Sequence, residues 1–404
     1  MKTTNRKRTK VISMLLTLVM VFGVFASIPF TASAATSGDY EYEVLNEKYV
    51  EIVGYRGAKS NIVIPTKIGK YDVFVVGESA FEGNTKITIV NIPYGISYVE
   101  DRAFYNCANL NEISLPLSIV LLGKEVFEGT AYYNNKENWE TRCLYIDSCL
   151  IKYRGEAKTY TIKDTTTVIA NNAFYENDTL RTVTFPEYLV SIGDYAFYNN
   201  RELDCDLIFP QYLSHIGSWA FYGTECEKVV LPDSLVSLGE AVFYHGAIKE
   251  AKLPNNIVAI PEHLFYNCSL TSISFPKTVK YIGFGAFAFN ELRELTIPNH
   301  IEYIDGWAFN GNPLMEINLP DKYVEIYKSA FEQTDYYGYG DWEDGVLYVG
   351  DYAIAAKFRS TSLSFRKGTK YLAAEICYDF DDLKEVNIPD SVQCIGSRAF
   401  VNCL

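Results

Sequence analysis

The dipeptide Ala-Phe, or a close variant of it, returns at nearly fixed intervals along most of this chain. Successive members of this Phe column lie 22 to 24 residues apart, except for two intervals of 47 and 46 residues. Self-similarity at this period is typical of a solenoid, in which each repeat forms one coil that packs against its neighbours. The thirteen members of the column are Phe81, Phe104, Phe127, Phe174, Phe197, Phe221, Phe243, Phe265, Phe287, Phe309, Phe331, Cys377 and Phe400.

A second column, usually Pro, lies 11 residues before the Phe in twelve of the thirteen repeats. The residue before this column is Ile, Leu or Phe, and the residue two positions earlier is also apolar. A polar residue usually lies between them, as in Leu295-Thr296-Ile297. Alternation with a period of two predicts a short strand with one buried face. The Pro ends the strand because it has no N–H to donate.

Three further columns describe the rest of each coil. Val, Leu or Ile lies five residues before the Phe in all thirteen repeats, Gly follows it in seven, and Ala precedes the Phe in nine. Gly suits a tight corner, and a small residue beside a large ring suits the interior of a stack. Because one coil cannot bury its apolar face alone, stacking is expected to create one continuous core.

The segment Leu383–Cys403 reads LKEVNIPDSVQCIGSRAFVNC. It closely resembles the BspA-like (treponemal-type) leucine-rich repeat, L-x-x-I-x-I/L-P-x-x-v-x-x-I-G-x-x-A-F-x-x-C, and the resemblance extends over about residues 61–404. It implies a curved, right-handed leucine-rich-repeat solenoid with short parallel strands on the concave face and helical turns or irregular coil on the convex side. It also implies a secreted or surface-attached bacterial protein, often linked to adhesion, and it brings no catalytic residues.

Tyr-rich insertions at about 132–156 and 335–358 fill the two long intervals. The first contains LYIDSCLIKYRG, in which apolar residues alternate around a turn, and this predicts a hairpin. Its end, Tyr153–Lys158, is similar to Tyr55–Lys59 near the N-terminus, and the second insertion is a weaker copy. We therefore infer a capping hairpin at 35–60 and an array at 61–404 with two hairpin insertions. Because the array stops in mid-repeat without a polar cap, the pattern favours a fragment of a longer chain.

The N-terminus has the features of a signal peptide. A basic segment ending at Lys10 precedes an apolar run from Val11 to about Ile28, and Ala32-Ser33-Ala34 provides small residues for cleavage after Ala34. A retained membrane anchor is the alternative, because the apolar run is nearly long enough to span a bilayer. No second apolar run of that length follows. The sequence thus predicts a secreted or cell-surface protein, with 1–34 as signal peptide and no transmembrane segment after its cleavage.

Charge and motifs argue against several classes of function. The chain has 36 basic and 50 acidic residues, a net charge of −14. Removal of the five basic residues of the signal peptide leaves 31 − 50 = −19, which disfavours a nucleic-acid partner. The sequence contains no HExxH, CxxC or GxSxG motif, and its four His residues fall in four different columns. We therefore predict no metal, no cofactor and no enzymatic activity.

Two motifs have simpler explanations within the repeat. Residues 283–288, GFGAFA, match a relaxed dinucleotide-binding pattern, but Gly283 is a corner Gly and Phe287 belongs to the Phe column. Among the nine Cys, the members of one repeat column are expected to be buried thiols. Cys143 and Cys149 flank the predicted hairpin, and the sequence leaves open whether they form a disulfide. That repeat column contains Cys107, Cys268 and Cys403.

The exposed face of the predicted strands is the first candidate binding surface. An acidic column lies four residues before the Pro column, and polar residues accompany it. Glu294 and Glu316 belong to adjacent repeats, so their side chains are expected roughly 5 Å apart, able to bind a cation or a basic ligand. A solvated face near basic side chains is the alternative. The candidate residues are Glu250, Glu294, Glu316, Thr296 and Asn318.

A tyrosine column is the second candidate surface. Tyr follows the Phe column in seven repeats, five of them consecutive, and these five are expected to form an exposed ladder. Aromatic rings offer contact area at a low entropic cost, so such ladders suit sugars and protein partners. The alternative is ordinary packing along the coil edge. The five residues are Tyr175, Tyr198, Tyr222, Tyr244 and Tyr266.

These patterns favour a secreted or cell-surface binding or adhesion protein whose leucine-rich-repeat scaffold binds protein or glycan ligands without catalysis. Two alternatives differ in class. The array could be the ligand-targeting module of a larger extracellular enzyme whose catalytic domain lies beyond residue 404, or a structural spacer without a specific ligand. The sequence does not identify the ligand.

Overall fold

A computed structural model of the chain describes residues 34–357 and 361–403. Apart from Ala34, the predicted signal peptide lies outside the described residues. The described residues form two compact units. Unit 1 contains the residues up to 205 together with 209–224 and 234–239, and unit 2 contains 206–208, 225–233 and 240 onward.

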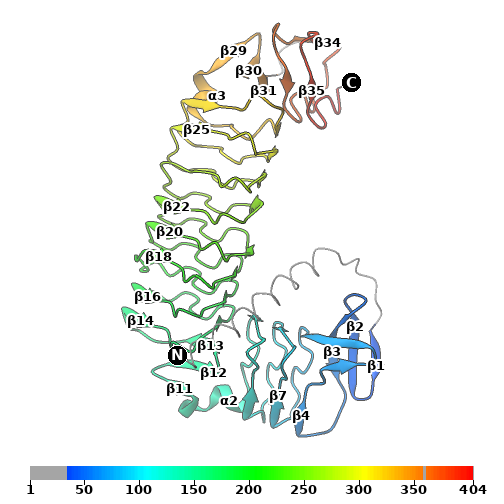
Figure 1. Ribbon diagram of the computed structural model, residues 1–404, viewed down its shortest axis with the longest axis vertical. Coiled ribbons are helices and arrows are strands. Elements are labelled where there is room, and N and C mark those ends of the chain that lie inside the picture. Colours follow the sequence, from blue (N-terminus) through cyan, green and yellow to red (C-terminus); the bar gives the residue numbers. More distant parts are fainter. Residues whose placement is uncertain (1–33, 358–360, 404) are drawn as a thin grey trace. The chain divides into compact units, whose positions relative to one another are not determined.

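Most coils contribute a short strand that ends just before the Pro column, as the alternation predicts, but the coil of Pro276 has none. Neighbouring strands of this first row pair in parallel, and the middle residue of most of them is buried. In unit 1 the strands are β4 (Asn61–Val63), β7 (Ile89–Asn91), β9 (Glu112–Ser114), β14 (Thr159–Thr161) and β16 (Thr182–Thr184). In unit 2 they are β18 (Leu207–Ile208), β20 (Lys228–Val230), β22 (Glu250–Lys252), β25 (Glu294–Thr296), β27 (Glu316–Asn318), β32 (Ser362–Ser364) and β34 (Glu385–Asn387) (Figure 1).

A second row of parallel strands was not predicted. It forms at the apolar column five residues before the Phe, where the sequence indicated only a corner. In unit 1 the row contains β6 (Tyr71–Val76), which also pairs with β5 (Lys67–Ile68), and β8 (Tyr98–Val99), β10 (Leu121–Leu122), β15 (Val168–Ile169), β17 (Ser191–Ile192), β19 (His215–Ile216) and β21 (Ser237–Leu238). In unit 2 it contains β23 (Ala259–Ile260), β24 (Tyr281–Ile282), β26 (Tyr303–Ile304), β28 (Glu325–Ile326), β33 (Tyr371–Leu372) and β35 (Cys394–Ile395).

The Ala-Phe segments are turns that form a third ladder of main-chain hydrogen bonds. The residues two before and two after the Phe have positive φ in most coils, for example 57° at Arg102 and 54° at Asn106. This conformation directs alternate N–H groups toward the next coil. Phe104 N, for example, donates to Val126 O at 3.0 Å. The residues two before and two after the Phe donate in the same way, as Arg102 N does to Lys124 O and Asn106 N does to Glu128 O. We call these sets of three hydrogen bonds between coils the turn ladder.

The Phe column fills the core, as predicted. The ring of Phe174 stacks on Phe197 with 4.5 Å between centroids in unit 1, and that of Phe243 stacks on Phe265 at 5.3 Å in unit 2. From Phe81 to Phe331 every ring of the column is at most 3% exposed. The leucine-rich-repeat solenoid predicted from the sequence is therefore confirmed.

Three antiparallel meanders interrupt or precede the coils. They contain β1 (Ala35–Ser37), β2 (Tyr40–Val44) and β3 (Tyr49–Tyr55); β11 (Trp139–Glu140), β12 (Cys143–Ile146) and β13 (Cys149–Tyr153); and β29 (Asp341–Glu343), β30 (Val346–Val349) and β31 (Tyr352–Ala356). Each has three strands rather than the two of a hairpin, and its third strand pairs in parallel with a second-row strand. A Thr-capped helix, α2 (Ala131–Asn134) or α3 (Asp335–Tyr339), precedes each insertion meander, with a 3₁₀ turn, η1 (Lys136–Asn138), after α2.

The first two meanders share details that the repeat pattern does not require. The ring of Tyr55 packs on Phe81 at 5.3 Å, and that of Tyr153 packs on Phe174 at 4.8 Å. A Cβ added at Gly57 or at Gly155 would lie within 2.3 Å of the corresponding Tyr ring, so Gly lets each ring fold over the chain. The last Tyr of each of these two meanders thus takes the place of a Phe in the stack.

Cys143 and Cys149 are both free thiols. Cys143 lies opposite Tyr153 and Cys149 lies opposite Ile146, so this register does not pair the two thiols. The Sγ atoms of Cys107 and Cys268 donate to main-chain carbonyls of the preceding coil at 3.0 Å, in buried positions. In the described part of the chain, no helix has the length and apolar character needed to cross a membrane.

Candidate functional site

The acidic column predicted on the exposed face of the strands is continuous over only part of its length. Glu294 lies opposite Glu316 on β25 and β27, and Thr296 lies opposite Asn318. Glu250 is on β22 in a different sheet, and Ser272 holds the corresponding column position of the intervening coil. Glu250 forms an ion pair with Lys228 at 3.0 Å. The structure therefore brings together one acidic pair and not the whole column.

The tyrosines stack in both units. In unit 1 the rings of Tyr175 and Tyr198 are 5.1 Å apart and 5° from parallel, and those of Tyr198 and Tyr222 are 4.5 Å apart. In unit 2 the rings of Tyr244 and Tyr266 are 4.5 Å apart. Tyr175 is 38% exposed, and the other four are partly exposed. The tyrosine rings therefore pack against one another along the coil edge and still leave part of their surface accessible to a ligand.

A second aromatic column, two residues before the Phe, joins the tyrosines. The ring of Tyr195 lies 5.5 Å from Tyr198 and stacks on Trp219 at 6.4 Å, and Trp219 lies 5.6 Å from Tyr222. Sequence reasoning missed these two residues because it considered only the position after the Phe. We call the unit 1 surface made by Tyr175, Tyr195, Tyr198, Trp219 and Tyr222 the aromatic edge.

Two histidines also flank a tyrosine in unit 2. The rings of His245 and His263 lie 4.6 and 5.9 Å from Tyr244. His245 and His263 thus lie beside the same tyrosine although they belong to different repeat columns. In the described ranges, no group of three or more His, Cys, Asp or Glu residues is arranged to hold a metal ion.

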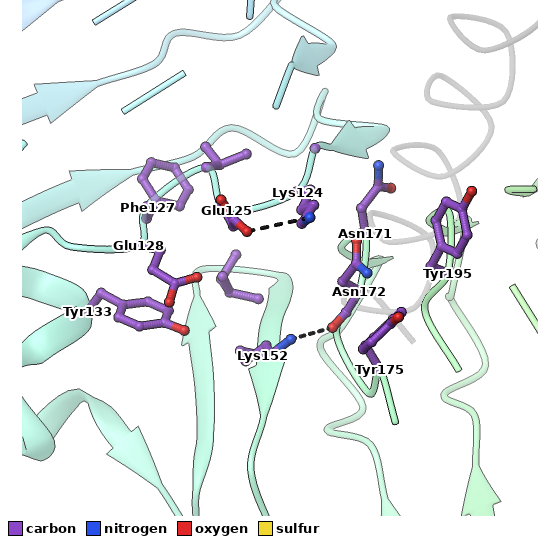
Figure 2. Close-up of a pocket in the computed structure, with 13 residues that line it drawn as sticks. Lys124, Glu125, Phe127, Glu128, Tyr133, Lys152, Asn171, Asn172, Tyr175 and Tyr195 are labelled. Carbon is purple, nitrogen blue, oxygen red and sulfur yellow. Dashed lines mark hydrogen bonds and ion pairs between the residues drawn. The ribbon is translucent and has the colours of Figure 1, made fainter. Parts of the chain in front are cut away.

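The first insertion opens a cleft between two coils of unit 1 (Figure 2). The cavity has a volume of about 520 Å³. The coil of Phe127 forms one side, the coil of Phe174 forms another, and β13 contributes Ile151 and Lys152. The lining residues are Gly123, Lys124, Glu125, Val126, Phe127, Glu128, Tyr133, Ile151, Lys152, Asn171, Asn172, Tyr175 and Tyr195.

The cleft exists because the meander completes the turn ladder on one side only. Tyr153 N donates to Ala173 O at 2.8 Å, the position that a Phe N–H takes in an ordinary coil. On the other side, the main-chain N–H groups of Glu125, Phe127 and Gly129 have no acceptor within the described ranges. In the preceding coil the equivalent three groups all donate, as Phe104 N does to Val126 O.

Charged side chains of both signs line this cleft. Lys152 Nζ donates to Asn172 O at 2.7 Å, and burial lowers the pKa of Lys152, an effect that Glu128 and Glu125 oppose. Lys124 and Glu125 form an ion pair at 3.6 Å. The Glu128 carboxylate has no ion-pair partner among residues 34–357 and 361–403, and it lies beside Tyr133 in Figure 2. The cleft therefore offers both hydrogen-bond donors and acceptors.

The sequence contained a signal for this cleft. The interval of 47 residues between Phe127 and Phe174 showed where an insertion interrupts the stack. It did not show whether the inserted residues seal the break, because that depends on which side of the meander continues the ladder.

A family model described as a BspA type leucine rich repeat region matches residues 60–181, 167–292 and 280–404. The chain belongs to the BspA-type leucine-rich repeat family. This confirms the family resemblance seen in the sequence. No curated protein matches the chain.

Solved structures of bacterial leucine-rich repeat proteins are similar to the chain. A protein from Bacteroides ovatus is 25% identical over 76% of this chain and 92% of its own, with a TM-score of 0.34. A cell-surface protein from Faecalibacterium prausnitzii is 20% identical over 76% of this chain and 93% of its own, with a TM-score of 0.28. The pneumococcal vaccine antigen PcpA is 15% identical over 89% of this chain and 99% of its own, with a TM-score of 0.31.

Proposed function

We propose that this BspA-type protein is a secreted or cell-surface binding protein that holds protein or glycan ligands on its aromatic edge and catalyses no reaction. The observation that carries the proposal is the stack of Tyr175, Tyr198 and Tyr222, extended by Tyr195 and Trp219. Stacked rings on rigid coils need little ordering when a ligand binds, so most of their contact area contributes to affinity.

The aromatic edge is a better candidate than the acidic strand face. Glu250 is neutralised by Lys228, and Asn318 Nδ2 donates to Glu316 Oε1 at 2.9 Å. An exposed ion pair of this kind contributes little free energy, and a ligand would have to replace both contacts. The pair of Glu294 and Glu316 favours a second candidate function, the binding of a basic ligand, because two facing carboxylates attract positive charge.

A binding screen of the full chain against matrix proteins, mucins and bacterial glycans tests the proposal. Three variants separate the surfaces: Tyr198→Ala with Tyr222→Ala, Glu250→Ala with Glu294→Ala and Glu316→Ala, and Tyr281→Ala as a control. Tyr281 is 44% exposed and lies outside the aromatic edge.

Loss of binding in the tyrosine variant alone is the expected result. Loss in the glutamate variant alone would move the site to the strand face. A chain that binds nothing in the screen would contradict the proposal and would favour a spacer, or a module that serves a larger enzyme.

A further inference from the structure

We propose that the cleft opened by the first insertion is a saccharide site, which holds the neutral end of a glycan between the coils of Phe127 and Phe174. This inference rests on the proposed function, because it assigns a ligand class and a second contact site to the same binding protein. It does not require the aromatic edge to be the main binding surface.

The size and position of the cleft suit a small polar ligand. Its volume of about 520 Å³ lies within the range of roughly 300–1,000 Å³ typical of ligand pockets. One ring face of Tyr175 is covered by Tyr198, while Tyr175 and Tyr195 both line the cleft. A glycan held in the cleft would therefore leave it along the aromatic edge.

Main-chain donors lie at one side of the cleft, since Glu125 and Phe127 line it and Gly129 directly follows the lining residue Glu128. The N–H groups of Glu125, Phe127 and Gly129 would have met carbonyl oxygens of the next coil if the array were continuous. Glu125 and Gly129 are partly exposed, and main-chain N–H groups without a partner are rare in folded proteins. A ligand hydroxyl would supply the missing acceptor. The Lys152 ammonium adds donors, because its bond to Asn172 O uses one of its three N–H groups.

Acceptors lie beside these donors. The Glu128 carboxylate has no ion-pair partner in the described part of the chain, and the Asn172 side chain offers both an oxygen and an NH₂ group. A sugar hydroxyl both donates and accepts. Two neighbouring hydroxyls can therefore donate to Glu128 and accept from Lys152, bonds to charged groups that are worth more than neutral ones.

The balance of charge favours a neutral sugar over an acidic one. The lining contains two Lys and two Glu, and Lys124 and Glu125 already pair with each other. The ammonium of Lys152 lies close enough to Glu128 and Glu125 for both carboxylates to raise its pKa. The chain as a whole carries −14. An added carboxylate would be repelled by Glu128 and by this overall field.

An array of oligosaccharides that end in mannose, galactose or N-acetylglucosamine, probed with the full chain, tests the inference. Sialylated and uronic-acid oligosaccharides form the acidic set. Lys152→Met and Glu128→Gln are expected to weaken binding to the neutral set by about ten- to a hundredfold, the loss of one hydrogen bond to a charged group. Lys277→Met and Glu187→Gln, at exposed turns next to the Pro column, are the matched controls.

Hydrogen exchange gives a second measurement that needs no variant. The amides of Glu125, Phe127 and Gly129 should exchange more slowly when the bound oligosaccharide is added. Unchanged exchange at all three amides, binding confined to the acidic set, or neutral binding untouched by both cleft variants would each overturn the saccharide site. A chain that binds a protein ligand but no sugar would overturn this inference alone, and the proposed function would stand.

Discussion

At the scale of single residues, the Phe column is expected to dominate stability. Phe243 is fully buried and stacks on Phe265, whereas Thr296 is exposed on β25. Phe243→Ala should lower the free energy of unfolding by about 3–5 kcal/mol, and Thr296→Ala should change it by less than about 0.5 kcal/mol. Denaturant unfolding of the two variants checks this. Equal midpoints would contradict the role given to the column.

A second residue-scale prediction concerns Glu51, which lies on β3 in unit 1. Burial, followed by the carboxylates of Glu100 and Glu43, raises the pKa of Glu51 to about 8. In the unfolded chain a Glu titrates near about 4.3. Because the folded pKa is the higher one, the protonated carboxyl stabilises the fold at low pH, and this contribution is lost as the pH rises toward 8.

The difference in melting temperature between wild type and Glu51→Gln should therefore depend on pH. Wild type is expected to lose stability relative to the variant between pH 5 and pH 8, since Gln stays neutral throughout. Glu47→Gln, at an exposed turn, is the control and should track wild type. A pH-independent difference for Glu51→Gln would show that its carboxyl is ionised in the fold.

At the scale of elements, the first two meanders depend on a glycine two residues after their last Tyr. A Cβ at Gly155 would lie 2.3 Å from the ring of Tyr153, which is 4% exposed and packs on Phe174. Gly155→Ala should destabilise the chain by about 1–3 kcal/mol through overpacking. Gly338→Ala is the comparison, because no atom lies within 4 Å of its added Cβ. If both variants had the melting temperature of wild type, this would argue against the packing of Tyr153 over Gly155.

The same elements show how far the sequence predicts this structure. The first strand row was predictable because three consecutive residues at each strand show the alternation of apolar and polar side chains, as in Leu295-Thr296-Ile297. The second row was missed because strands such as Tyr303–Ile304 have two residues, too few to show alternation. The additional strand of the first insertion, β11, was missed because Trp139 and Glu140 carry no pattern of their own. Tyr195 and Trp219 were missed because their column is mixed, and stacking there depends on which coils carry aromatic residues.

At the scale of the whole molecule, the array is modular, and this leads to a deletion experiment. Removal of 24 residues, 133–156, shortens the interval between Phe127 and Phe174 from 47 to 47 − 24 = 23 residues, an ordinary repeat length. It also places Lys163 twelve residues after Phe127, as Pro116 follows Phe104. Because coils contact only their neighbours, the two coils should then stack directly.

In the shortened chain, Phe127 N is expected to donate to Ala173 O, and the turn ladder would run without a break. The amides of Glu125, Phe127 and Gly129 should therefore become strongly protected in hydrogen exchange, while the chain keeps its circular dichroism and a cooperative melt. The cleft would close, so binding of neutral oligosaccharides should be lost and the stack of Tyr198 and Tyr222 retained. A shortened chain that folds but leaves these amides unprotected would show that the break in the ladder is a property of the two coils and not of the meander between them.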